Sequence, residues 1–247
     1  LRGLPDVRRG RMTLNLRRLS TSAYDAASVL DAITGLTLSS KALAMAERAG
    51  RLILSGDFDG GMKRFEGDMT LTTDAGVATF TASRQPVKGT EKPMADVNAH
   101  ADLRHIRLGH ILGSKALGDA TASADFVGRS VEGHLSGDLA AHIHNVEFKE
   151  CRYEDIDVKG SVVDKSFTGH ITDSGEPLDI DISGQVNLNG AEPQYDFAVD
   201  LKSADLHAMN INKRDSVSVL SLRADIYAVG RNIDDMNGRV DMIIDGG

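Results

Sequence analysis

From residue 52 to the end of the chain, apolar and polar residues alternate with a period of two. In the segment LDIDISGQVNL, residues 178–188, apolar residues and one glycine occupy the even positions, and polar residues occupy the odd ones. Successive side chains of a β-strand point to opposite faces, so this pattern predicts strands with one apolar and one wet face. Because parallel strands covered on both faces have continuous apolar runs, the alternation favours an antiparallel sheet.

The segments 22–35 and 38–50 have a different pattern, in which Ala, Val, Leu and Ile recur at three and four residues. This spacing predicts two helices of about ten residues each. Ser22 or Asp25 can cap the first helix, and Gly35 and Gly50 can end the two helices.

The segment DLRHIRLGHILG, residues 102–113, predicts a shorter helical turn between strands. Together these patterns predict an N-terminal segment of strand and helices, residues 1–51, followed by one continuous repetitive sheet, residues 52–247. The expected fold is mainly β. It is an elongated, curved antiparallel sheet with two short N-terminal helices and short helical steps between repeats.

The segment SGDFDGGMKRFEGD, residues 55–68, has Asp57, Asp59 and Asp68 at positions 1, 3 and 12 of a possible calcium loop. An EF-hand requires an acidic residue or Asn at position 5 and Gly at position 6, where this chain has Gly61 and Met62. A similar frame recurs at residues 123–137 and 223–243 without the paired carboxylates. We therefore predict a β-hairpin in which Asp-Gly-Gly supplies the turn.

Composition excludes several classes of function. The net charge of −8 opposes binding to nucleic acid. Only 4% of the residues are aromatic and none is Trp, which is few for a surface that binds carbohydrate or single-stranded nucleic acid. The single Cys151 allows no internal disulfide. No apolar run is long enough for a membrane-spanning helix, and the N-terminal residues lack the apolar core of a signal peptide.

Catalytic and metal-binding patterns are also missing from the sequence. His134, His142 and His144 lie close together, but no further Cys or His completes a zinc site. The Asp pairs in EDIDVKG and LDIDISG could act as general acid and base, but each pair lies on the polar side of a strand, where solvated charge is usual. Cys151 has no evident His partner that would activate its thiol. We predict no enzyme, no metal site and no cofactor. A glycan-processing β domain is the enzyme alternative.

Three sets of motifs resemble the TamB branch of the AsmA-like proteins, particularly the large versions of Bacteroidota-type envelopes. They are residues 48–80, RAGRLILSGDFDGGMKRFEGDMTLTTDAGVATF, the steps ADLRHIRL and ADLHAMNI, and residues 151–171, CRYEDIDVKGSVVDKSFTGHI. The resemblance implies a segment of a periplasmic protein that is anchored in the inner membrane by a helix outside this chain. It further implies a sheet curled into a trough with an apolar interior, and a TamA-like outer-membrane barrel as partner.

The family is linked to phospholipid movement between membranes and to assembly of outer-membrane proteins. We therefore expect a conduit whose apolar groove binds phospholipid acyl chains. A scaffold that pairs with unfolded outer-membrane strands is the alternative. The groove is either open or closed as a core against the helices. Its candidate lining residues are Leu54, Phe58, Met69, Leu71, Ala122, Ala124, Phe126, Leu135, Ile180, Ile182, Val186, Phe197, Val199, Leu222, Ile226 and Met242.

Overall fold

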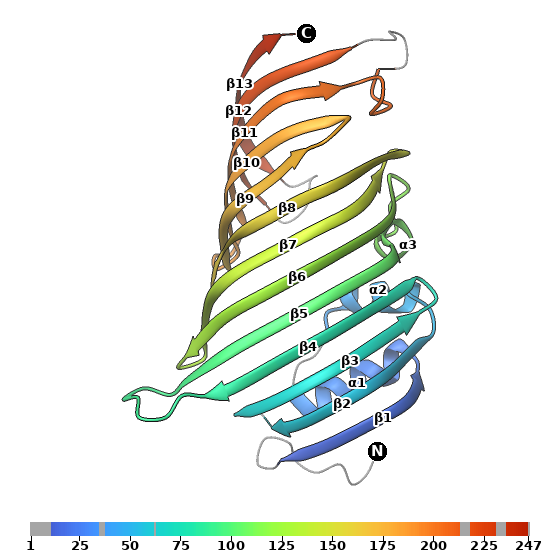
Figure 1. Cartoon of the computed structure of the whole chain (residues 1–247), viewed down its shortest axis with the longest axis vertical. Helices are drawn as coiled ribbons and strands as arrows, with labels where there is room; N and C mark the ends of the chain where they lie inside the picture. Colours follow the sequence, from blue (N-terminus) through green and yellow to red (C-terminus); the bar gives the residue numbers. More distant parts are fainter. Residues whose placement is uncertain (1–10, 35–37, 62, 213–217, 231–235, 247) are drawn as a thin grey trace. The chain divides into compact units, whose positions relative to one another are not determined.

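The structure, a computed structural model of the 247-residue chain, describes residues 11–34, 38–61, 63–212, 218–230 and 236–246. The described strands form an antiparallel sheet of thirteen strands, whose order follows the chain from β1 to β13 (Figure 1). The chain divides into two compact units, Leu1–Glu132 and Gly133–Gly247, and each is described by itself. No described helix is both long and apolar enough to cross a membrane.

The first unit contains six strands and three helices among its described residues. They are β1 (Met12–Thr21), α1 (Ala23–Thr34), α2 (Ser40–Arg48), β2 (Leu52–Gly61), β3 (Arg64–Thr73), β4 (Gly76–Pro86), β5 (Met94–Arg107), α3 (Leu108–Leu112) and β6 (Leu117–Val131). Each strand pairs antiparallel with the next one along the chain. The mainly β, antiparallel prediction is confirmed, because the alternation gives every strand one apolar face.

The two N-terminal helices are confirmed. The Ser22 hydroxyl accepts a hydrogen bond from the Asp25 amide at 3.1 Å, so Ser22 caps α1. Ser39 caps α2 through the Ala42 amide at 3.2 Å, and Gly50, with φ of +84°, follows the end of α2. The predicted end of the first helix at Gly35 lies outside the described residues.

The first hairpin is confirmed, but its turn is not Asp-Gly-Gly. Asp59, Gly60 and Gly61 belong to β2, and Gly61 pairs with Arg64 of β3. Asp59 stays in the strand because its carboxylate accepts hydrogen bonds from Thr13 and Arg11 at β1. β2 therefore ends at Gly61 and β3 begins at Arg64, and Met62 lies outside the described residues.

The second unit contains seven strands among its described residues and no described helix. They are β7 (His134–Phe148), β8 (Cys151–Val163), β9 (Ser166–Ser174), β10 (Leu178–Asn187), β11 (Gln194–Asp205), β12 (Val219–Val229) and β13 (Asn237–Gly246). Neighbours are again antiparallel, with irregular register inside the pairs β10–β11, β11–β12 and β12–β13. In each unit the sheet is open and curved (Figure 1).

The predicted helical steps differ between their two copies. The first copy of the Ala-Asp-Leu step belongs to β5, which bulges between Leu103 and Ile106 and continues directly into α3. In the second copy β11 ends at Asp205, whose carboxylate accepts hydrogen bonds from the His207 and Ala208 amides at 3.0 Å. These bonds hold a hydrogen-bonded turn rather than a helix, so only the first step is helical.

Candidate functional site

The apolar residues of the first unit form straight rows across neighbouring strands. One row runs through Leu54, Leu71, Ala78, Leu103 and Ala122, and the next through Met69, Phe80, Ala101 and Ala124. A third row runs through Leu14, Phe58, Gly67, Ala82, Ala99 and Phe126. All seven candidate groove residues of this unit therefore lie on one face of the sheet.

The helices pack against one end of this apolar face. Ala23 of α1 and Ala49 after α2 form a buried cluster with Leu52 and Ala75, and Leu71 packs against it. In Figure 1, α1 and α2 lie behind β1 to β4. The remainder of the face, around the Met69 and Phe58 rows on β3 to β6, is only half-buried, and the Phe80 side chain stays 40% exposed.

The second unit has the same arrangement without a helical cover in its described residues. Ile171, Ile182, Val199, Ala224 and Met242 form one row across five strands. Phe197 and Ile226 form part of the next row, Val186 of a third, and Leu222 with Leu201 of a fourth. Ile180 belongs to the fourth row through its partner Leu201. Leu135 lies on the same side of β7 as Gly137, which joins the Val186 row through Val162 and Phe167.

The solvent exposure of the apolar side chains differs from strand to strand. Among the described residues, no large side chain is fully buried, and the apolar side chains of β9 to β12 are mostly half-buried. At β13, Val240, Met242 and Ile244 are 54–63% exposed. Closed, interdigitated packing of the candidate residues is therefore not found in either unit.

Glycines on the apolar face of the second unit do not leave free space. Gly160, Gly169 and Gly184 are neighbours in one row, where a Cβ at each position would clash first with a carbonyl oxygen of the neighbouring strand, 2.1–2.3 Å away, and also with an aromatic ring. Phe167 covers the first two glycines and Phe197 covers the third, with ring atoms 2.6–2.7 Å from the positions of those Cβ atoms. The small residues therefore accommodate rings of the protein itself.

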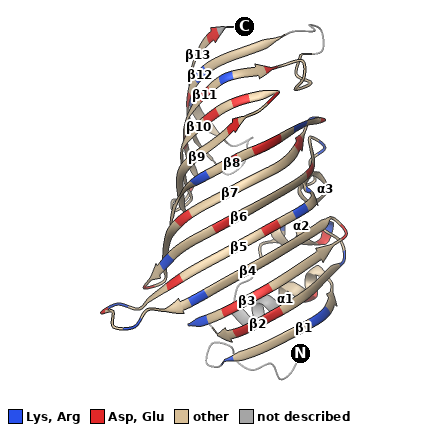
Figure 2. Ribbon diagram, in the orientation of Figure 1, with Lys and Arg blue, Asp and Glu red and all other residues tan. Residues whose placement is uncertain are grey.

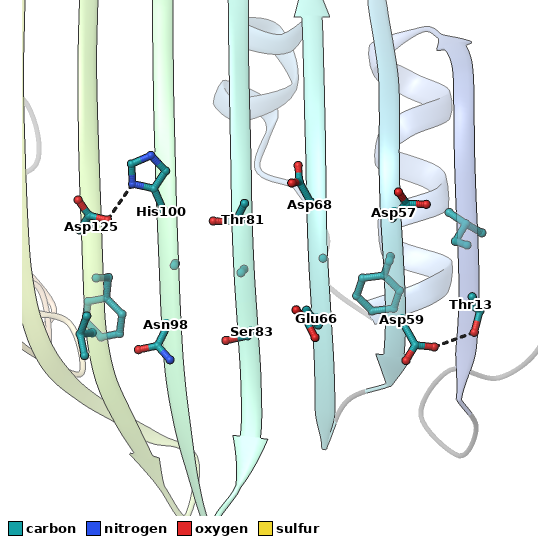
Figure 3. Close-up of a pocket in the computed structure, with 17 residues that line it drawn as sticks. Thr13, Asp57, Asp59, Glu66, Asp68, Thr81, Ser83, Asn98, His100 and Asp125 are labelled. Atoms are coloured by element: carbon teal, nitrogen blue, oxygen red, sulfur yellow. Dashed lines mark hydrogen bonds and ion pairs between the residues drawn. The ribbon is translucent and has the colours of Figure 1, made fainter.

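A groove of about 620 Å³ lies on the opposite, polar face of the first unit (Figure 3). Two rows of polar side chains form its sides, and the backbone of the Phe58 row forms its floor. The rows are Asp57, Asp68, Thr81, His100 and Asp125, and Thr13, Asp59, Glu66, Ser83 and Asn98. A similar groove of the second unit is lined by Arg223, which pairs with Asp245 at 2.9 Å, and by Asp181, Asp200, Asp225 and Asp241.

Carboxylates face one another directly across β2 and β3, which sequence reasoning missed. Asp57 pairs in register with Asp68, and Asp59 with Glu66. Like charges opposite each other destabilise a sheet, but β1 supplies donors to two of them. Asn15 donates to Asp57 at 2.5 Å, and hydrogen bonds from Arg11 and then Thr13 lower the pKa of Asp59. Metal-ligand clusters are absent among the described residues.

Three histidines pair with aspartates of the neighbouring strand, and a fourth pairs with an aspartate of a turn, an arrangement that alternation alone did not predict. The Nδ1 atoms of His100, His142 and His170 lie 2.7, 3.0 and 3.2 Å from Asp125, Asp157 and Asp181. Hydrogen bonds with Asp125 and then Asp102 raise the pKa of His100, and the bond with His142 lowers that of Asp157. Figure 2 shows the acidic residues, together with Lys and Arg, along the strands of both units.

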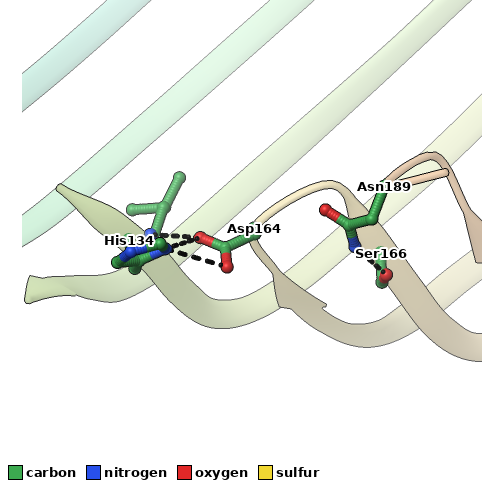
Figure 4. A network of polar contacts seen from close by, with 5 residues as sticks. His134, Asp164, Ser166 and Asn189 are labelled. Atoms are coloured by element: carbon green, nitrogen blue, oxygen red, sulfur yellow. Dashed lines mark hydrogen bonds and ion pairs between the residues drawn. The ribbon is translucent and has the colours of Figure 1, made fainter. Parts of the chain in front are cut away.

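The fourth pair joins a turn to the start of a strand (Figure 4). His134 Nδ1 lies 3.1 Å from Asp164 in the β8–β9 turn, and Asp164 also accepts from the Leu135 amide at 3.2 Å. Nearby, Asn189 donates to the Ser166 hydroxyl at 2.8 Å. The rings of His142 and His144 lie next to each other, with centroids 4.5 Å apart, while His134 belongs to the network around Asp164.

The free thiol of Cys151 is buried beside Tyr153 and Asp173 in the second unit. Burial, followed by the hydrogen bond with Cys151, raises the pKa of Tyr153 to about 12. Burial also raises the pKa of Asp173, whose Oδ1 accepts from the Gly175 amide at 2.9 Å. Raised pKa values keep Tyr153 and Asp173 neutral over a wider range of pH, which suits their buried positions.

No protein-family model matches this chain, and no curated protein or solved structure matches it either. The resemblance to the TamB branch therefore stays a prediction. The geometry defines a β-sheet protein in which each unit presents one half-buried aliphatic face and one charged face.

Proposed function

We propose that the apolar faces of the sheet form a track for the acyl chains of phospholipids, as part of a periplasmic bridge between membranes. The observation that carries this proposal is the alignment of all sixteen candidate residues on the apolar side of their unit, half-buried or exposed rather than sealed. A largely apolar surface that remains accessible to solvent favours an apolar occupant.

The free-energy cost of moving a phospholipid through water without such a track is large. A phospholipid carries about thirty methylenes, and exposing them to water costs about 0.8 kcal/mol each, on the order of 25 kcal/mol in all. A continuous aliphatic face offsets most of this cost. Binding of this kind needs no catalytic group.

Native mass spectrometry of the purified chain tests this proposal directly. We expect co-purifying phospholipid, and we expect Ile182→Asp to lower its occupancy several-fold, because a carboxylate would be desolvated under the acyl chains. Ser183→Asp is the matched control, since Ser183 follows Ile182 on β10 and lies on the opposite face. Equal lipid occupancy in the two folded variants, or absence of lipid from the unmodified chain, contradicts the proposal.

A strand-pairing scaffold is the second candidate function. The exposed apolar side chains of β13 favour it, because an accessible edge strand is a template for pairing with another chain. Binding of extended outer-membrane strand peptides without any bound lipid would support this scaffold over the lipid track. Crosslinking from β13 identifies the paired strand.

A further inference from the structure

Arg84 lies on the apolar face of the first unit. Its register partners are Phe65 on β3 and Val97 on β5, and this row continues to Gly60 and Gly128. Arg84 alternates in phase with Ala82, Phe80 and Ala78 on its own strand. Among the described positions of β2 to β6 that share this face, Arg84 is the only charged residue.

The guanidinium of Arg84 lacks a counter-charge within the described chain. Its Nε atom is buried and has no hydrogen-bond partner. Each ion pair among the described residues uses other side chains, including the neighbouring pair of Arg129 and Asp96 at 2.8 Å. A buried donor of a charged group is costly to leave unpaired, so this position favours an anion from outside the chain.

The surroundings of Arg84 indicate what kind of anion fits. Leu71 packs against the cluster that contains the helices. Two apolar rows, those of Met69 and Phe58, separate the Leu71 row from the Arg84 row. Six residues of strand separate Leu71 from Phe65, about 20 Å. One leaflet of the bilayer hydrocarbon core is about 15 Å thick, so an acyl chain fits between these limits.

We infer that Arg84 binds the phosphate of a phospholipid whose acyl chains run in the strand direction, across the Phe58 and Met69 rows toward Leu71. This inference rests on the proposed function and adds a fixed orientation, with the head group at the Arg84 end of the face. A guanidinium presents paired N–H donors that match two phosphate oxygens. The aliphatic stem of Arg84 continues the apolar surface beneath the chains.

Two lipids that differ only in the phosphate head group test this inference on the complete chain. The probes are dioctanoyl phosphatidylglycerol and dioctanoylglycerol, with affinities measured by titration calorimetry. We expect the unmodified chain to bind the phosphatidylglycerol about tenfold more tightly. Arg84→Gln should remove this preference and leave the affinity for dioctanoylglycerol unchanged. Arg64→Gln is the matched control, because Arg64 precedes Phe65 on β3 and lies on the other face.

Arg84→Met gives a second readout that does not depend on the Gln variant. It keeps the apolar stem and removes the unpaired charge, so we expect a higher Tm without lipid and a smaller rise of Tm on adding phosphatidylglycerol. Equal binding of the two probes by the unmodified chain, or an unchanged preference for phosphatidylglycerol in the Arg84 variants, overturns this inference and leaves the proposed function standing. Failure of the unmodified chain to bind either lipid overturns both.

Discussion

At the scale of single residues, the polar face is held by specific pairs and the apolar face by a few buried aliphatic contacts. His100 lies between Asp125 at 2.7 Å and Asp102 at 3.3 Å, with its side chain partly exposed. Leu52, by contrast, is 7% exposed and belongs to the cluster that joins the helices to the sheet. Stability at these two positions therefore depends on different variables, pH for the first and packed volume for the second.

The pairing of His100 predicts a pH dependence of stability. Its pKa is raised in the folded chain, so the pair stabilises the fold below the unfolded pKa of about 6.5, and this stabilisation is lost as the pH rises through the folded value. We expect the unfolding free energy to fall less between about pH 6 and pH 8 in His100→Gln than in the unmodified chain. Urea titrations at each pH measure this, and His110→Gln is the control. Identical slopes for all three proteins contradict the prediction.

Removal of Leu52 tests the helical cluster. We expect Leu52→Ala to lower the unfolding free energy by about 2–4 kcal/mol, because the deletion leaves a cavity among Ala23, Ala49 and Ala75. Leu112→Ala on α3 is the control, since Leu112 is 43% exposed, and its effect should stay within about 0.5 kcal/mol. Chemical denaturation gives both values. Similar losses in the two variants would show that the cluster does not stabilise the first unit.

At the scale of elements, each strand was predictable from its own residues, whereas its partners on the same face were not. The segment 178–188 alternates cleanly, and β10 occupies nearly the same residues. Register with β9 and β11 decides that Gly184 lies between Gly169 and Phe197. The ring above Gly184 therefore comes from another strand, Phe197 of β11.

The ring of Phe167, which lies over Gly160 and Gly169, gives a second test of packing. Phe167→Ala should destabilise the chain by about 1–3 kcal/mol, less than a fully buried Phe, because Gly160 and Gly169 would lose the ring above them. Phe148→Ala is the control, since Phe148 is 40% exposed near a turn. Thermal unfolding compares the two variants. If Phe167→Ala unfolds at the same temperature as the control, the rings do not support the row.

At the scale of the whole molecule, two compact units share one strand-by-strand order but differ in how their apolar faces are covered. In the first unit, α1 and α2 pack on one end of the face. In the second, the described residues include no helix, and β13 is exposed on both faces, with Ile243 and Ile244 each 63% exposed. Only the first apolar face is covered by described helices, because α1 and α2 pack on that unit.

The exposed strand β13 predicts concentration-dependent self-association of this chain. Met242→Lys should weaken that association at least several-fold, because a charged edge opposes pairing, and it should change stability by less than about 0.5 kcal/mol. Sedimentation velocity over a range of concentrations measures the effect. Gln194→Lys on β11 is the control, as Gln194 is exposed on a strand that already has two partners. Unchanged association in Met242→Lys contradicts this role of β13.

The sequence by itself determined the antiparallel β class, the two N-terminal helices and the residues that share each apolar face. These features depend on local periods of two and three to four residues, which can be read from neighbours in the chain. Only the tertiary structure decided the acidic pairs of β2 and β3, the His–Asp pairs, the rings above the glycine row and the isolated Arg84. Each of these depends on register between strands, which is set by long-range pairing and bulges rather than by the residues of one strand.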